Sequence, residues 1–365
     1  MSDVVLKKIS YGELRDKSYE FKDDRYGIAA FFTDAVRQTL LACPGYQKDT
    51  DDVFWVLYDG DVVVGRELRF GTRLKVNDEI VWAQSGCAME VCEEYQKTGA
   101  GVLLLLESTR SKGYGVNISA FFTVMRVKLF KKQKITVFEI PQFMKLVNTR
   151  FLFESVFKLR GVFLNISTWI VNGFLKVLEI PNRIRTKKLM RSYTLKKETI
   201  VPEWAGVMAT SDEHKYMEYH DARWLQWNLD YNLNGFPEDI QSFYAVYDHS
   251  GVPQGFFMTK ERLEKEAGRY RNIIRGTVVE WATSDNSRLS EADLNLLAIS
   301  TFSSHTSHIT TVTVDSATEK QLKKIGFKAH GTFQMSFKDK TGLYADGTDM
   351  SLWRIRFGCC NSIVF

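Results

Sequence analysis

The sequence predicts an α/β (α+β) protein of two similar halves, each with a mixed, mostly antiparallel sheet flanked by helices. Two observations predict this fold. Residues 54–65 form a hairpin pattern of two apolar, β-branched runs joined by an Asp-Gly turn, and residues 243–255 repeat it with one extra turn residue. After each hairpin the chain continues with a strand, a helix, a strand, a helix and a strand, which indicates a tandem repeat.

In the first half, two helices are expected around residues 26–41, before the hairpin. The second hairpin strand continues through residues 66–76 and ends at the turn Asn77-Asp78. The elements that follow are a strand at 81–91, a helix from 102, a strand at 116–122, an amphipathic helix at 125–133 and a strand at 135–140.

The second half repeats this order after its own hairpin. It has a strand at 276–282, a helix at 290–302, a strand at 308–314, a helix at 317–325 and a strand at 332–337. A chain of 365 residues is long enough for two such domains. We expect an N-terminal domain at 1–149, a basic helical linker at 150–193 and a C-terminal domain at 194–365.

Composition excludes several classes of protein. A hydrophobic content of 44% and an aromatic content of 13% indicate a folded chain. The five cysteines are odd in number and lack a CxxC pattern, and the N-terminus lacks a secretory leader pattern, so we expect a reducing, cytoplasmic compartment. A net charge of +5 suits an anionic ligand, and no nucleic-acid partner is expected.

The most specific motif is the stretch Gln96-Lys97-Thr98-Gly99-Ala100-Gly101, which lies between a strand and an apolar helix. Glycines at this spacing let a ligand approach the backbone closely. The first N–H groups of the helix have no intrahelical partner, and the helix dipole favours a negative charge beside them. The motif therefore predicts a phosphate site.

Neither common phosphate loop fits, because the P-loop's Lys-Ser/Thr pair and the third glycine of the dinucleotide fingerprint are both missing. The stretch matches Gln/Arg-x-x-Gly-x-Gly/Ala and resembles the pyrophosphate loop of the GNAT superfamily of acyl-CoA N-acyltransferases. The element order and the helix end at residues 322–327 resemble that superfamily too. The resemblance implies a degenerate tandem protein that binds acetyl-CoA or another acyl-CoA as substrate, without a metal. The implied acyl-CoA-binding residues are Met89, Val91, Gln96, Lys97, Thr98, Gly99, Ala100 and Gly101.

The resemblance also implies direct transfer of the acyl group to an amine. A base must take the proton of the amine, and Glu90 is the nearest carboxylate on the strand before the loop. The general-acid tyrosine typical of the family is absent, because Phe130 and Leu322 stand at the matching positions. The second half lacks the phosphate loop, since residues 285–290 contain no glycine. It would supply part of the acceptor pocket or only shield the first half.

Three functions remain open at this point. The first is an N-acyltransferase acting on an amine of a small molecule or amino sugar. The second is a non-catalytic acyl-CoA-binding or scaffold protein, which the missing tyrosine favours. The third is a transferase of similar tandem fold that takes its acyl group from aminoacyl-tRNA, which the intact phosphate loop opposes.

Two further stretches each have two interpretations. Residues 161–180 are apolar, with basic residues on both flanks and Pro181 after them, which fits a linker helix packed between domains or a peripheral membrane contact through 161–191. A polar-aromatic cluster precedes the second hairpin and fits either the core face of an amphipathic helix or a platform for a sugar ring. Its members are Trp224, Trp227, Asn228, Asp230 and Tyr231.

Overall fold

A computed structural model describes residues 4–359, apart from 112, 121–123, 232–238 and 269. The first half contains the strands β1 (Val4–Ser10), β2 (Asp52–Asp59), β3 (Val62–Val76), β4 (Glu79–Val91), β5 (Val116–Ala120) and β6 (Thr136–Leu146). Its helices are α1 (Tyr11–Asp16), α2 (Asp34–Leu41), α3 (Ala100–Thr109) and α4 (Val124–Lys132). The order predicted from the first hairpin onward is confirmed, although the end of the strand predicted at 116–122 lies outside the described residues.

The beginning of the chain differs from the prediction. Strand β1 was not predicted, and α1 lies well before the expected region at residues 26–41. Helix α1 begins there because Ser10 and Glu13 form a capping box, in which each side chain accepts a backbone hydrogen bond from the other residue. A six-residue helix is too short to show a helical hydrophobic period, so only its cap marks it in the sequence.

The second half contains β7 (Tyr193–Glu198), β8 (Tyr216–Glu218), β9 (Ile240–Asp248), β10 (Pro253–Ala267), β11 (Tyr270–Thr283), β12 (His308–Val312), β13 (Lys328–Asp339) and β14 (Trp353–Arg354). Its helices are α8 (Glu203–Thr210), α9 (Ala222–Asp230), α10 (Glu291–Thr301) and α11 (Ser316–Lys324). The segment between the halves forms α5 (Arg150–Ser155), α6 (Gly161–Leu178) and α7 (Ile180–Ser192), so its predicted helical character is confirmed.

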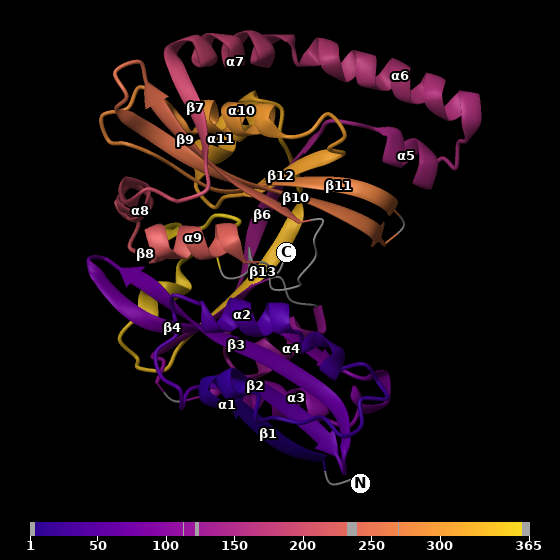
Figure 1. Cartoon of the computed structure of the whole chain (residues 1–365), viewed down its shortest axis with the longest axis vertical. Helices are drawn as coiled ribbons and strands as arrows, with labels where there is room; N and C mark the ends of the chain where they lie inside the picture. Colours follow the sequence, from indigo (N-terminus) through magenta and orange to yellow (C-terminus); the bar gives the residue numbers. More distant parts are fainter. Residues whose placement is uncertain (1–3, 112, 121–123, 232–238, 269, 360–365) are drawn as a thin grey trace.

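The two halves share one sheet, whose main path runs β1-β2-β3-β4-β5-β13-β6-β12-β11-β10-β9-β7 (Figure 1). The last strands of the halves are exchanged. Strand β13 of the second half lies between β5 and β6, and β6 of the first half pairs with β12. Each half therefore completes its sheet with a strand of the other. The predicted domain boundaries at 149 and 194 stay a prediction.

Helix α9 provides a second connection between the halves. Trp227 donates a hydrogen bond from its indole nitrogen to the carbonyl of Thr39, at 2.8 Å, and packs against Phe70. Trp224, Trp227 and Asn228 are buried. The core-face interpretation of this aromatic cluster is thus confirmed, and the sugar-platform interpretation is wrong for the two tryptophans, because their rings fill the core between α9 and the first half.

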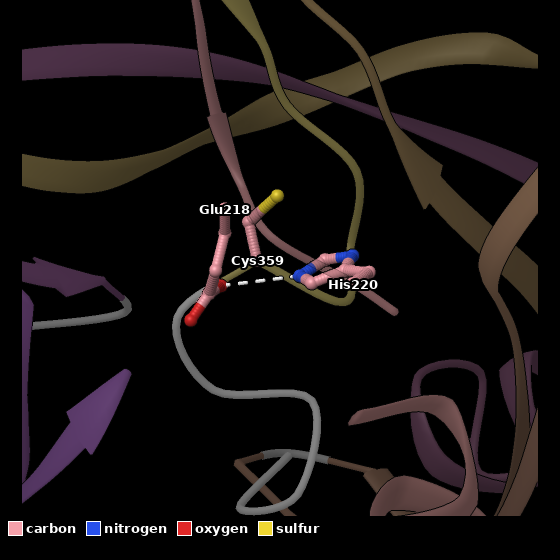
Figure 2. Close-up of side chains that lie close together, drawn as sticks. All are labelled: Glu218, His220 and Cys359. Atoms are coloured by element: carbon pink, nitrogen blue, oxygen red, sulfur yellow. Dashed lines mark hydrogen bonds and ion pairs between the residues drawn. The ribbon is translucent and has the colours of Figure 1, made fainter. Parts of the chain in front are cut away.

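A buried cluster of charged groups links the halves at β8 (Figure 2). His220 lies between two carboxylates, with Nδ1 facing Glu280 and Nε2 3.4 Å from Glu218. Glu218 also accepts a hydrogen bond from Thr72 of the first half, at 2.6 Å, and Glu280 is paired with Arg354 at 2.8 Å. All of these side chains are buried, so their charges are stabilised chiefly by one another.

The pKa values in this cluster follow from the pairing. Burial alone would lower the pKa of His220, but Glu280 and Glu218 raise it above its ordinary value of 6.5. Burial alone would raise the pKa of Glu280, but Arg354 and His220 lower it to about 2. The folded protein therefore holds an imidazolium between two carboxylates, and its stability depends on pH.

We predict that the free energy of unfolding falls as pH rises above 6.5, because the unfolded chain loses the His220 proton while the folded chain keeps it. The slope attributable to this group is about 1.4 kcal/mol per pH unit and ends once pH passes the raised pKa. Urea unfolding of the wild type and His220→Gln between pH 6 and 8 measures it. The variant should be less stable at pH 6 by about 3–5 kcal/mol and should lack this slope.

His249→Gln is the matched control, because His249 is exposed. It should retain the wild-type slope. An unchanged slope in His220→Gln would contradict the assignment of the proton to His220.

Candidate functional site

The candidate site lies where β4 and β5 separate. The two strands are parallel partners from Ala83 and Val116 to Gly86 and Ser119. Beyond Gly86, β4 continues to Val91 without a partner on that side among the described strands. The strand is buried from Ala83 to Cys87, and residues 88–91 are accessible. The separation leaves a strand edge whose backbone groups can pair with an extended ligand.

A β-bulge shapes this edge. Glu67 of β3 lies opposite two residues of β4, Ala88 and Met89, and Ala88 adopts a left-handed conformation with φ of +48°. The guanidinium of Arg66 holds the bulge by donating to the carbonyl of Ala88, at 2.6 Å. The side chains of Met89 and Val91 face Gly101 of α3, so these two residues would meet a ligand through their backbone.

The loop after β4 leads into an uncapped helix. Gly99 has φ of +92°, is exposed and precedes α3 without a capping side chain. The N–H groups of Ala100 and Gly101 lie in the first turn, where an α-helix offers no partner. Gln96 donates to the carbonyl of Val91 at 3.1 Å, which fastens the loop to the end of β4. Lys97 and Thr98 are exposed at its surface.

Glu90 lies on the open part of β4. Its carboxylate is 2.5 Å from Nη2 of Arg66, and 53% of its side chain is exposed. Arg66 is itself buried and also donates to the carbonyl of Ile28, at 3.0 Å. Glu90 therefore has a fixed position beside the bulge, with solvent on its other side.

The structure reveals a charged group below the separation that sequence reasoning missed. Buried Glu67 accepts hydrogen bonds from Arg69 at 2.9 Å, Arg126 at 2.6 Å and Ser108 at 2.6 Å. The group joins β3 to α3 and α4 and holds two cations against one anion. A Cβ at Gly86 would lie 3.0 Å from Cζ of Arg69, so Arg69 is beside the residue where the strands part. The only sequence signal for this group is that Glu67 and Arg69 lie two residues apart, on the same face of a buried strand.

The positions matching the family tyrosine are apolar and buried. Phe130 packs with Leu105 and Ile135, and Leu322 lies in the core of the second half. Neither position offers a hydroxyl to a leaving thiolate. Arg69 and Arg126 supply positive charge near the separation that can stabilise a negative charge there.

The counterpart of this site in the second half consists of the N-terminus of α10 and the edge of β11. Other parts of the chain occupy both. Helix α10 has a capping box, in which Ser290 accepts from the N–H of Asp293 and the Asp293 carboxylate accepts from the N–H of Ser290. A carboxylate of the chain thus lies at this helix N-terminus. Arg185 of α7 pairs with it at 2.8 Å. Helix α3 has neither feature.

The edge of β11 is also occupied. Strands β11 and β12 pair only up to Thr277 and Thr310, as β4 and β5 do up to Gly86. Beyond that point the C-terminal segment lies along β11, where Gly358 donates to the carbonyl of Val279 at 2.9 Å and Arg354 to the carbonyl of Trp281 at 3.2 Å. In the second half the chain itself thus fills the place that no described residue fills in the first.

One group of side chains has the composition of a metal site. Ligand atoms of Glu218, His220 and Cys359 lie within 4.8 Å of one another (Figure 2). The raised pKa of His220 favours an imidazolium, which lacks a free lone pair for a metal. Burial raises the pKa of the Cys359 thiol, which disfavours the thiolate. A metal at this group would have to displace both protons and the ion pairs of His220 with Glu218 and Glu280. The expectation of a metal-free protein stays a prediction.

No protein-family model and no curated protein sequence match the chain. Solved structures match it over most of its length. N-myristoyltransferase from Saccharomyces cerevisiae with bound myristoyl-CoA aligns with a TM-score of 0.57 at 10% identity, covering 93% of this chain and 79% of that chain. A probable N-acyltransferase from Enterococcus faecalis aligns with 0.51 at 10% identity, covering 91% and 72%.

A third match is a GCN5-related N-acetyltransferase from Anabaena variabilis, with a TM-score of 0.50 at 10% identity, covering 93% of this chain and 73% of that chain. At such identity the likeness concerns the fold, and it extends over both halves. Together with the repeated order of elements, it assigns the architecture. The chain has the fold of the acyl-CoA N-acyltransferase (GNAT) superfamily, in a form with two tandem GNAT-like domains.

Proposed function

We propose that the protein is an acyl-CoA-dependent N-acyltransferase that holds acyl-CoA in its first half and acylates an amine of a small molecule or amino sugar. One observation carries the proposal. Among the described residues, the β4 edge beyond Gly86 and the α3 N-terminus have no strand partner and no capping side chain, whereas the corresponding edge and helix of the second half are both occupied. The N-acyltransferase fold of the solved neighbours, one with bound myristoyl-CoA, supports an acyl-CoA ester as the ligand.

The open features match the parts of acyl-CoA. The pyrophosphate would accept hydrogen bonds from the backbone N–H groups of the loop and of the first turn of α3. The pantetheine arm carries amide groups and would pair with the edge of β4 at residues 88–91. This register directs the thioester toward the bulge at Ala88, where a backbone N–H can bind the carbonyl oxygen.

The transfer requires no covalent intermediate with the protein. The amine nitrogen attacks the thioester carbon, the C–N bond forms, and the C–S bond breaks as CoA leaves as thiolate. The proton of the amine passes to a base, and the thiolate is stabilised by Arg69 and Arg126 until it takes a proton from solvent. Glu90 is the proposed base, because it is accessible and fixed by Arg66 beside the bulge.

The buried Phe130 supports a second candidate, a protein that binds acyl-CoA without transferring the acyl group. Release of thiol from acetyl-CoA and myristoyl-CoA over a panel of amines, amino sugars and short peptides separates the two candidates. Thiol release that depends on the amine supports the enzyme. Binding without release supports the second candidate, and the absence of binding to any CoA ester contradicts both.

We predict that Gly101→Glu weakens acyl-CoA binding at least ~30-fold, which corresponds to ~2 kcal/mol, because a carboxylate would occupy the phosphate position at the helix N-terminus. A Cβ at Gly101 would lie 3.6 Å from Met89, an ordinary contact, so the variant should fold. Calorimetric titration with acetyl-CoA and myristoyl-CoA measures the effect.

Gly101→Ala is the matched control, since it adds the Cβ without the charge and keeps the loop pattern. It should bind within a few-fold of the wild type. Equal affinities of Gly101→Glu and the wild type would remove the loop from the site.

We predict that Glu90→Gln lowers kcat by about 10²–10⁴ and leaves acyl-CoA affinity unchanged, because it removes the base but retains the shape of the side chain. Steady-state rates and a titration of each variant measure both quantities. Glu93→Gln changes a neighbouring exposed carboxylate and should retain full kcat. Undiminished activity of Glu90→Gln would end the assignment of Glu90 as base.

A further inference from the structure

The outward face of α6 is apolar and uncovered. Helix α6 and helix α7 run nearly end to end along the side of the molecule opposite the N-terminus, and α6 projects beyond the sheet (Figure 1). The side chains of Phe163, Trp169 and Phe174 are 76%, 78% and 63% exposed. The other exposed apolar residues from α5 to α7 are Val156, Phe157, Val162, Ile166, Ile170, Val177, Leu178, Ile180, Ile184 and Met190. So many exposed apolar side chains on neighbouring helices indicate a binding surface.

The two asparagines of α6 contact the protein body instead. Asn172 accepts hydrogen bonds from the N–H and the hydroxyl of Thr149, at 2.9 and 2.8 Å, and donates to Asn148 at 3.1 Å. Asn165 accepts from Arg150 at 3.1 Å. The inward side also buries Leu164, but most of the large apolar side chains of α6 lie on its outward side, unlike those of a usual surface helix. This excludes the interpretation of α6 as a linker helix buried between domains, because only 6% of its 18 residues are buried.

Basic residues surround the apolar face. They are Lys158 and Arg160 before α6, Lys176 near its end, and Arg183, Lys187, Lys188 and Arg191 along α7. All seven are exposed, and none of them forms an ion pair with a carboxylate in the described part of the chain. Their charge is therefore available to an anionic partner.

We propose that α6 and α7 form a membrane-binding surface that inserts its apolar face into the interface of an anionic lipid bilayer. An amphipathic helix with aromatic and aliphatic residues on one side and Lys and Arg beside it binds at the level of the headgroups. The seven cations complement the anionic lipids, and the exposed Trp169, midway along α6, suits the interface. This inference is independent of the proposed acyl transfer.

The structure favours this arrangement over a membrane-spanning one. Helix α6 is long and apolar enough to cross a bilayer by length and composition. However, the hydrogen bonds of Asn165 and Asn172 and the ion pair of Lys145 with Glu179 at 2.6 Å fix one side of it to the body. A spanning helix would have to break these contacts and expose its polar side to lipid, which is costly. The helix therefore lies in the plane of the interface.

Membrane binding would also orient the candidate site. The phosphate loop and α3 lie in the half remote from α6 and α7 (Figure 1). On a bilayer, the loop would face the aqueous phase, and a soluble acyl-CoA could reach it without crossing the lipid. The membrane would concentrate the protein without covering the open edge of β4.

Co-sedimentation of the full chain with vesicles tests the proposal. We expect binding to phosphatidylcholine vesicles that contain one-third phosphatidylserine, and at least tenfold weaker binding to phosphatidylcholine alone. Phe163→Glu combined with Phe174→Glu should reduce binding at least 100-fold, because each substitution removes a large apolar side chain from the lipid. Trp169→Phe should abolish most of the blue shift of tryptophan fluorescence that accompanies binding.

Matched controls separate the surface from a general loss of solubility. Leu343→Glu alters a residue that is 75% exposed outside this surface and should bind as the wild type does. Lys187→Ala with Lys188→Ala should weaken binding about tenfold, whereas Lys131→Ala with Lys132→Ala in α4 should not.

Three outcomes would overturn the proposal. The first is equal vesicle binding by Phe163→Glu/Phe174→Glu and the wild type. The second is resistance of the bound protein to extraction at alkaline pH, which would indicate a spanning helix. The third is a dimer in sedimentation equilibrium that these two substitutions dissociate while vesicles bind no protein, which would assign the face to a second copy of the chain.

Discussion

The separation of β4 from β5 after Gly86 is the constraint on which the rest of the account depends. Backbone N–H and C=O groups inside a protein require partners, so a strand that leaves its neighbour needs another occupant for its edge. In the second half that occupant is the chain itself, through Gly358 and Arg354 on β11. In the first half the edge of β4 is accessible beside an uncapped helix. Within the described residues, one half thus has an accessible strand edge and the other an occupied one.

The exchanged strands explain why the closed half is retained. Strand β13 lies between β5 and β6, so the second half supplies the neighbour that supports β5 at the edge of the candidate site. The cluster around His220 and the packing of α9 on α2 connect the halves again. The second half therefore contributes rigidity to a site to which it lends no ligand-binding loop, and loss of its charges would be transmitted to β3 through Thr72.

Much of this architecture follows from the sequence because its elements are long and periodic. The two hairpins, the glycine loop and the order of strands and helices after them carry strong local signals. The strand exchange carries none, because β6 and β13 have the same pattern whichever neighbour they pair with. Short α1 was missed for lack of a period. At the site, Gly99 and Glu90 were predicted from the motif and its strand, whereas Arg69 and Arg126 come together only through tertiary packing.

The asymmetry of the two halves is the central claim, and amide hydrogen exchange on adding acyl-CoA tests it most directly. Exchange should slow at residues 87–103, where the edge of β4, the loop and the first turn of α3 would gain partners. It should stay unchanged at residues 278–293, where the C-terminal segment and the Ser290–Asp293 capping box already supply them. Slowed exchange at 278–293 with none at 87–103 would place the ligand in the other half and contradict the account.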